Sequence, residues 1–243
     1  MTNVFTIYRR EMRSYFTSPI AYIFIVVFLV LMAVYFFFIA RFFKSDNPDL
    51  RDYFIMFPFA FALLIPAVTM RLWSEEKKSG TVEILMTLPL RSWEVVLAKD
   101  LAAYTVIAIA IVLTLSVPLS VSFVLQLDWG SVLASYIGAF LLAALYAAIG
   151  AWLSALTVNQ IVALLASIVL FFFLWGIGLP MVMENVNTYL GAAIGNAIGW
   201  FGTFYHYHDF AKGLLRLVHF VYALSLTAFF LILNNFAVEW RKF

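Results

Sequence analysis

The chain of 243 residues contains no cysteine, and only 12% of its residues are charged. The missing cysteines exclude a disulfide framework, a thiolate metal site and a thiol nucleophile. Apolar residues make up 65% of the chain, whereas a globular domain is nearer half apolar and a quarter charged. Such a chain has too little polar surface to coat a soluble fold. The composition therefore predicts a protein that crosses a membrane several times.

Several motifs of enzymes and nucleotide-binding proteins are also missing. No Gly-Lys pair occurs, which excludes the GxxxxGK[ST] loop that cradles nucleotide phosphates. The His-Glu-x-x-His and Gly-x-Ser-x-Gly motifs are absent as well. The net charge is +2 and no basic stripe is present, so nothing indicates a nucleic-acid partner. We therefore expect no catalytic residue, and no cofactor or metal bound by this chain.

What the sequence does have is long stretches without Asp, Glu, Lys or Arg. A helix needs about 20 apolar residues to cross the roughly 30 Å of hydrocarbon in a bilayer. Four stretches hold one span each, and a fifth, over residues 129–183, holds two. The fold class is therefore all-α, a polytopic membrane protein with six transmembrane helices. They are predicted near residues 20–40, 53–72, 99–125, 131–156, 159–181 and 217–237.

The sixth charge-free stretch, residues 185–208, is too polar to be a span. It is interpreted as the start of a re-entrant or interfacial helical segment, over residues 185–213, that packs against protein. Gly191, Gly195 and Gly199 are spaced four apart, which places small residues on one helical face and permits close packing. A glycine-rich loop is the alternative.

Residues 1–18 have the pattern of an amphipathic helix. On a helical projection Tyr8 and Phe16 lie on the aromatic side, and Arg9, Arg10 and Arg13 lie on the adjoining basic side. A basic, aromatic helix of this kind lies flat at the membrane interface. It either serves as an anchor alone or also contacts a cytoplasmic partner.

The loop over residues 73–94, between the second and third predicted spans, has the highest concentration of charge. Gly80 can end one helical segment and Thr81 can cap the next, which Pro89 would stop. A short rigid helix joined to two spans would act as a lever for a partner that binds it. A solvated connector is the alternative.

Charged groups are absent from the predicted membrane centres, although proton- and ion-coupled carriers usually keep such groups at mid-depth. This absence disfavours a secondary carrier. His206, His208 and Asp209 stand close together in the sequence and suggest a metal hypothesis. We prefer a structural role for these residues at the polar rim of the re-entrant segment.

The charged loop carries a recognisable motif. Glu-Glu-Lys-x-x-Gly-Thr-x-Glu-x-Leu-x-x-x-Pro, from Glu75 to Pro89 and followed by Lys99, resembles the cytoplasmic signature of ABC-2-type ABC transporter permeases. The opening Ile7-Tyr8-Arg9-Arg10-Glu11 and the segment Tyr205-His206-Tyr207-His208-Asp209 are similar to the gliding-motility-type (GldF-like) branch. The resemblance covers nearly the whole chain.

This resemblance implies six spans, cytoplasmic termini, an interfacial N-terminal helix and re-entrant helices before the last span. It implies that a coupling helix docks on the ATP-binding subunit. The residues carried over to that role are Glu75, Glu76, Gly80, Thr81, Glu83, Leu85 and Pro89.

The resemblance also implies partners. ATP and Mg would bind on a separate ATP-binding subunit, present in two copies per complex. A second permease copy or a paralogue would complete the membrane domain, and an auxiliary subunit with an extracytoplasmic domain would be a further partner. The expected location is the lipid bilayer of a bacterial cytoplasmic membrane. Two alternatives are transmission of ATP-driven motion to extracytoplasmic partners without cargo, and, less favoured, a secondary carrier or channel.

The distribution of basic residues predicts the topology. Ten Lys and Arg residues lie on the side of the N-terminus and five on the opposite side, so both termini should be cytoplasmic. A reporter fused after residue 243 should therefore behave as a cytoplasmic protein. A periplasmic signal from that fusion would contradict the six-span arrangement.

Overall fold

The computed structural model describes residues 2–40, 42, 49–81 and 91–240, and within these the chain is helical without strands. In the first half of the chain the elements are α1 (Thr2–Thr17), α2 (Pro19–Val34), the π-helix η1 (Tyr35–Ile39), α3 (Arg51–Ile55), α4 (Phe57–Thr69), α5 (Arg71–Ser79), α7 (Ser92–Leu113) and α8 (Ser116–Ser122). In the second half they are α9 (Trp129–Leu156), α10 (Gln160–Gly176), α11 (Pro180–Leu190), α12 (Ala192–Trp200), α13 (Thr203–Ala211) and α14 (Leu217–Glu239). The predicted all-α fold is confirmed.

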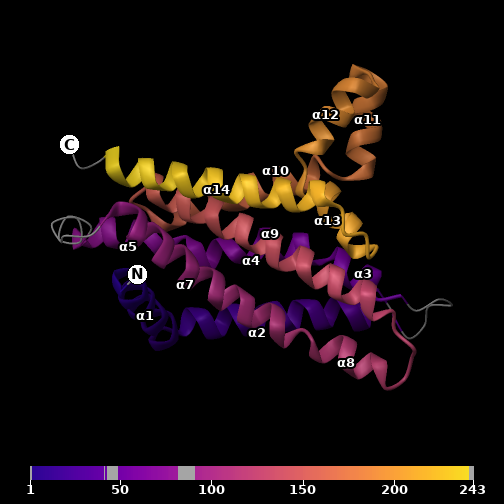
Figure 1. The fold of residues 1–243 in the computed structure, drawn as a ribbon, viewed down its shortest axis with the longest axis horizontal. Helices are drawn as coiled ribbons and strands as arrows, with labels where there is room; N and C mark the ends of the chain where they lie inside the picture. The colour runs from indigo at the N-terminus through magenta and orange to yellow at the C-terminus, as the bar shows by residue number, and fades with distance from the viewer. Residues whose placement is uncertain (1, 41, 43–48, 82–90, 241–243) are drawn as a thin grey trace.

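The long helices run side by side and give the bundle two distinct ends (Figure 1). We call one the α5 end, where α1, α5 and the last turns of α14 lie. We call the other the hairpin end, where α3, α8 and α13 lie and where α11 and α12 project from the bundle (Figure 1).

Five helical stretches are long and apolar enough to cross a membrane. They are Pro19–Ile39, Arg51–Ser79, Ser92–Ser122, Trp129–Leu156 and Leu217–Glu239. The span predicted near 159–181 differs from these, because α10 ends at Gly176 and the chain then bends by 71° into α11. Pro180 occupies the first turn of α11, where its missing N–H costs no helical hydrogen bond. Counting the bent pair as one span gives six.

Prolines coincide with two breaks in the spans. Pro58 follows the break at Met56, and Pro118 follows the break at Thr114 and Leu115. In each case the proline lacks the N–H that would bond to the carbonyl four residues earlier, and its ring crowds that carbonyl. Pro66, by contrast, stays inside α4.

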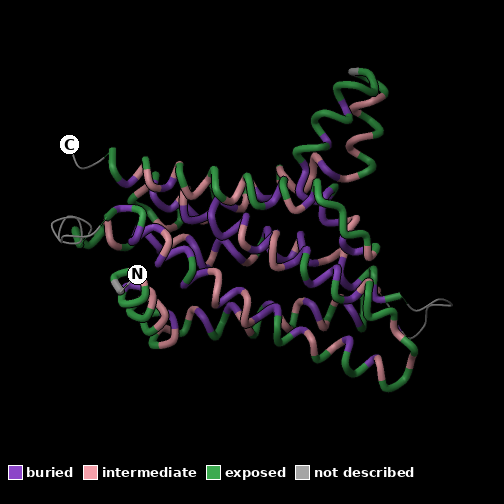
Figure 2. Tube along the Cα trace, in the orientation of Figure 1, coloured by how far each residue is buried: buried purple, intermediate pink, exposed green. Residues whose placement is uncertain are grey.

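Helix α9 is the centre of the bundle, and α4, α5, α7, α10, α13 and α14 all pack against it. Buried residues concentrate along this inner part of the bundle, whereas the hairpin of α11 and α12 is mostly exposed or intermediate (Figure 2). Two glycines on α9 permit the closest contacts. A Cβ on Gly150 would stand 2.2 Å from Thr69 Oγ1 of α4, and one on Gly138 would stand 2.6 Å from the Phe210 ring of α13.

Aromatic rings fill the space between α2, α4 and α9. Phe28 of α2 stacks on Phe61 with 5.6 Å between ring centroids and meets Phe57 edge-on at 5.9 Å. Phe57 in turn faces Tyr136 of α9 at 6.2 Å. These offset and edge-to-face arrangements are the favourable ones for aromatic pairs, and they join three spans through one apolar core.

The hairpin of α11 and α12 turns at Gly191, whose φ of +88° favours a glycine. Gly191 therefore does not share a helical face with the other two glycines. A Cβ on Gly195 would stand 2.0 Å from Asn187 Oδ1, and one on Gly199 would stand 2.5 Å from the Met183 methyl group. Small residues on α12 thus allow α11 to lie against it.

The Gly150 contact generates a stability prediction. Gly150→Ala places a methyl group against Thr69 in a fully buried interface and should cost about 1–3 kcal/mol through overpacking. Gly176→Ala is the matched control, since no heavy atom lies within 4 Å of its added Cβ. Thermal unfolding in detergent should show a lower Tm for the first variant only, and equal Tm values would contradict the close α4–α9 contact.

Candidate functional site

Helix α5 continues the second span and contains the first part of the charged loop. The loop predicted over 73–94 therefore begins as helix, which continues through Ser79. Gly80 ends the helix in the left-handed conformation with φ of +72°, and its N–H donates to the Lys77 carbonyl at 3.3 Å. This is the usual glycine stop of a helix, and it fixes where α5 ends.

The first turn of α5 is attached to α9 by one serine. The backbone N–H groups of Trp73 and Ser74 donate to Ser154 Oγ at 3.1 and 3.2 Å. Ser154 Oγ donates in turn to the Met70 carbonyl at 2.7 Å. The break between α4 and α5 leaves these backbone N–H and carbonyl groups without helical partners. Ser154, which is fully buried, supplies their hydrogen bonds. Lys77 Nζ also donates to the Ala155 carbonyl, so a second contact joins α5 to the end of α9.

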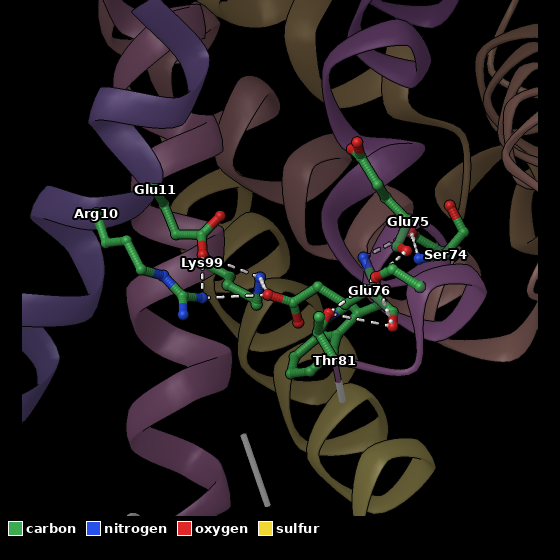
Figure 3. A network of polar contacts seen from close by, with 10 residues as sticks. Arg10, Glu11, Ser74, Glu75, Glu76, Thr81 and Lys99 are labelled. Carbon is green, nitrogen blue, oxygen red and sulfur yellow. Dashed lines mark hydrogen bonds and ion pairs between the residues drawn. The ribbon is translucent and has the colours of Figure 1, made fainter. Parts of the chain in front are cut away.

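A network of four charged side chains joins α5 to α1 and α7 (Figure 3). Lys99 Nζ donates to Glu11 Oε1 at 3.1 Å and to Glu76 Oε1 at 2.9 Å. Arg10 Nη2 donates to the same two oxygens, at 2.7 Å for Glu11 and 3.1 Å for Glu76. Each of the two basic side chains therefore contacts both carboxylates. Glu76 belongs to α5, Lys99 to α7, and Arg10 and Glu11 to α1. We call these four residues the Lys99 network.

Burial makes Lys99 the critical member of this network. Its side chain is 1% exposed, whereas those of Glu11 and Glu76 are 13% and 18% exposed. Its ammonium also lies 5.3 Å from the centroid of the Trp73 ring. An unpaired charge at this depth would cost several kcal/mol, which the two carboxylates offset.

The carboxylate of Glu11 responds to this environment. Burial alone would raise its pKa, but the Lys99 ammonium and the Arg10 guanidinium outweigh burial and hold the pKa below its usual value. Because the pKa is lowered in the folded protein, this stabilisation is present above the ordinary carboxyl pKa. It is lost only as the pH falls through the lowered value. Glu11 is therefore ionised at neutral pH.

The junction between α1 and α2 is bound to the junction between α4 and α5. Arg71 Nη1 donates to Ser18 Oγ at 3.1 Å, and its guanidinium lies 4.4 Å above the Tyr15 ring. The Tyr15 hydroxyl donates to the Val68 carbonyl at 2.8 Å. Between this junction and the Lys99 network lies a cavity of about 280 Å³, whose lining includes Arg10, Glu75 and Lys99.

The predicted coupling residues fall into two groups. Glu75 is exposed on α5, Glu76 belongs to the Lys99 network and Gly80 ends the helix. Thr81 Oγ1 lies 2.9 Å from Ser79 Oγ and donates to the Glu76 carbonyl at 3.3 Å. The remaining three residues, Glu83, Leu85 and Pro89, lie outside the described residues.

The predicted residues of the N-terminal helix lie on α1, which packs along α7. The Tyr8 hydroxyl is 3.1 Å from Thr105 Oγ1 of α7, and Phe16 meets the Tyr22 ring edge-on at 5.8 Å. Arg10 enters the Lys99 network, whereas Arg9 and Arg13 are exposed. Tyr8 and Phe16, on the aromatic side of α1, therefore each contact a neighbouring helix.

The two histidines of the predicted re-entrant segment have different surroundings. His206 is buried on α13 and contacts His219 of α14, whereas His208 is partly exposed and stacks on Phe204 with ring centroids 5.4 Å apart. Within the described residues, no three His, Cys, Asp or Glu side chains are placed to hold one metal ion.

The sequence analysis did not single out Ser154 or His219 as functional, and Glu11 and Lys99 entered only as parts of motifs. A charged residue next to a long apolar stretch, such as Lys99, indicates either an ion pair or an exposed position, because a charged side chain is almost never buried without a partner. Its partners were not predictable, since Glu11 is separated from Lys99 by 88 positions in the sequence.

The comparisons with known proteins agree with this architecture. The family described as ABC-2 family transporter protein matches residues 5–237, so the chain belongs to this family. No curated protein matches the chain. The family implies a multi-pass membrane subunit of an ABC transporter, a separate ATP-binding partner and no enzymatic activity of the subunit itself.

The Lys99 network generates the second stability prediction. Lys99→Met leaves Glu11 and Glu76 without the buried ammonium and should destabilise the protein by about 3–5 kcal/mol. Lys78→Met, at an exposed position of α5, should change the Tm little.

A double variant separates loss of the ion pairs from loss of packing. In Lys99→Met the two carboxylates share Arg10 as their remaining cation. Adding Glu11→Gln removes one of these two negative charges and should recover part of the lost stability. If the double variant unfolds at the temperature expected from adding the two single effects, the charges are not coupled as the distances indicate.

Proposed function

We propose that this chain is the permease subunit of an ATP-binding cassette transporter, driven by ATP hydrolysis on a separate subunit that binds Mg and ATP. The family match over residues 5–237 supports the subunit class. The observation that carries the ATP-driven mechanism is the attachment of α5. Helix α5 continues the second span as a rigid extension. It is fixed to α1 and α7 by the Lys99 network and to α9 by Ser154.

In this proposal α5 and the segment after Gly80 transmit force. A partner that pushes on α5 would displace α1, α7 and α9 with it, because each is joined to α5 by hydrogen bonds or ion pairs. Packed elements of this kind shift as rigid bodies between discrete arrangements and do not deform continuously. The charged surface of α5, with Glu75 exposed, would face the ATP-binding subunit.

The proposed setting is a bacterial cytoplasmic membrane with both termini and the α5 end in the cytoplasm. The distribution of basic residues supports this orientation. Two ATP-binding subunits would work with two permease chains, identical or paralogous, and an auxiliary subunit with an extracytoplasmic domain would complete the complex. The resemblance of the opening and of residues 205–209 to the GldF-like branch supports this composition.

A second function is the transmission of ATP-driven motion to extracytoplasmic partners without transport. The projecting hairpin of α11 and α12 favours it, since a surface that stands away from the bundle suits contact with another protein (Figure 1). Measured substrate flux in reconstituted vesicles would favour transport. ATPase activity that depends on the partner, without flux of any cargo, would favour transmission.

Gly80 offers a test of coupling. Gly80→Val should strain the left-handed conformation by roughly 1–2 kcal/mol, although the added side chain meets no heavy atom within 4 Å of its Cβ. Gly80→Asn is the matched control because asparagine tolerates this conformation. In the assembled complex the valine variant should show several-fold lower ATPase activity and weaker co-purification of the ATP-binding subunit, while the asparagine variant stays near wild type.

The isolated chain serves as the baseline in this experiment and should hydrolyse no ATP, since it lacks a phosphate-binding loop. Normal activity and normal co-purification of the valine variant would mean that the end of α5 is only a connector. The proposed lever would then be wrong.

A further inference from the structure

Two imidazole rings and a carboxylate form a continuous hydrogen-bonded array at the foot of the hairpin. His206 and Asp209 come from α13, and His219 comes from the first turn of α14. His206 Nε2 is 2.7 Å from the Trp200 carbonyl at the end of α12, and its Nδ1 is 2.7 Å from His219 Nδ1. His219 Nε2 is 2.9 Å from Asp209 Oδ2. We call this the histidine array.

The array joins three helices at one point. Its Trp200 end holds the last turn of α12, and the Tyr222 hydroxyl of α14 donates to the adjacent Phe201 carbonyl at 2.7 Å. The Tyr222 ring also stacks on His206 with centroids 3.7 Å apart. These contacts fasten the foot of the hairpin to α14, so loss of the array would loosen the hairpin.

Few charged groups surround the histidine array. Neither α4, α9, α10 nor α12 carries an Asp, Glu, Lys or Arg. The charged neighbour in contact is Arg216, whose Nη1 is 3.2 Å from Asp209 Oδ2. Asp209 also lines a cavity of about 380 Å³ together with Glu184 of α11, His208 and Lys212, and Arg51 of α3 lies beyond His208. The rings are 3% exposed, but the carboxylate has a route to solvent through this cavity.

A count of protons shows what the three contacts require. The Trp200 carbonyl can only accept, so His206 Nε2 carries a proton. The two Nδ1 atoms need one proton between them, and the contact between His219 Nε2 and Asp209 needs another. The array thus holds three protons, whereas two neutral imidazoles and an ionised carboxylate hold two. One additional proton is shared by His219 and Asp209.

We propose that the histidine array is a proton-binding site whose occupancy latches the foot of the α11–α12 hairpin to α14. With the proton bound, all three contacts are hydrogen bonds. When it leaves, only two N–H protons remain for three contacts. The contact without a proton is then His219 Nε2 with the carboxylate, His219 Nδ1 with His206 Nδ1, or His206 Nε2 with the Trp200 carbonyl. One contact becomes repulsive, and the latch opens.

The direction of the pH response follows from the proton count. The latched form holds one more proton than the open form, so low pH favours latching and rising pH favours opening. His206 must stay neutral for its Nδ1 to accept. Burial lowers the pKa of His206 to about 4, so this ring remains neutral across the range in which an ordinary imidazole titrates.

The same geometry does not suit a single metal ion. His219 presents Nδ1 to His206 and Nε2 to Asp209, on opposite sides of its ring. One ion therefore cannot bind all three side chains as they are placed. The proton is the ligand that the array fits, because each contact is at hydrogen-bond distance.

The absence of cysteine allows the latch to be measured with two spin labels. Tyr189→Cys places one on an 84% exposed site near the hairpin tip, and Leu133→Cys places the other on a 59% exposed site of α9. The labelled full chain, reconstituted in lipid nanodiscs and diluted with unlabelled chain, is measured from about pH 5 to about pH 9. The distance distribution should be narrow at low pH and should broaden as the pH rises.

Asp209→Asn is the decisive variant. Its amide N–H would donate to His219 Nε2 and leave His219 Nδ1–H to donate to His206, so the three contacts of the array are satisfied with neutral rings, while Arg216 loses its ion pair with residue 209. The distribution should therefore stay narrow at every pH. His208→Gln, two residues from His206 on the same helix and outside the array, should respond to pH as the wild type does. A wild type without pH response, or an Asp209→Asn variant that still broadens with rising pH, would overturn the proposal.

Discussion

The burial of one ammonium group organises the α5 end of the molecule. Lys99 lies in the third turn of α7, in a chain with few charged groups, and its side chain is only 1% exposed. Its charge is balanced by carboxylates from two other helices, Glu11 on α1 and Glu76 on α5. Separating any of these helices would expose or orphan a charge, which costs more than the breaking of ordinary apolar contacts. Helix α1, the α5 extension of the second span and the third span are therefore held as one body.

The opposite end is organised by a different kind of polar cluster. The Lys99 network is a set of ion pairs between two basic and two acidic side chains, whereas the histidine array closes only with an exchangeable proton. A permanent set of ion pairs suits a part that transmits force. An array with a removable proton suits the foot of the α11–α12 hairpin, whose attachment to α14 would then change with pH. The core between α2, α4 and α9 joins the two ends through stacked and edge-on aromatic rings, of which Tyr136 has a hydroxyl that is hydrogen-bonded to Thr114.

Local features of the fold were predictable from the sequence because they depend on residues close together along the chain. Charge-free stretches predicted the long helices, and the periodicity of residues 1–18 predicted α1. The Gly80 stop follows from the conformational freedom of glycine. The long-range contacts were not predictable in this way. The partners of Lys99 lie 23 and 88 positions away, and which carboxylates meet it depends on how three helices pack. The shortness of α10 also escaped prediction, since residues 177–183 are apolar enough to continue a span and the bend before Pro180 depends on local geometry.

The length of α9 fixes the depth at which the foot of the hairpin lies. Its 28 residues rise about 42 Å, some 12 Å more than the hydrocarbon layer requires. Tilt can absorb part of this excess, and the remainder must stand in the headgroup layer. At the hairpin end α9 is capped by the exposed carboxylate of Asp128, whose pKa is lowered by hydrogen bonds from the Ser131 hydroxyl and the Gly130 N–H. An ionised carboxylate belongs in the headgroup layer, not among acyl chains. Gly138 of α9, which touches Phe210, is only ten positions farther along, about 15 Å down the helix axis. This distance exceeds the roughly 5–7 Å depth of one headgroup layer. With Asp128 held among headgroups, the α13 segment beside Gly138 therefore reaches the depth of the acyl chains, where lipid composition can act on it directly.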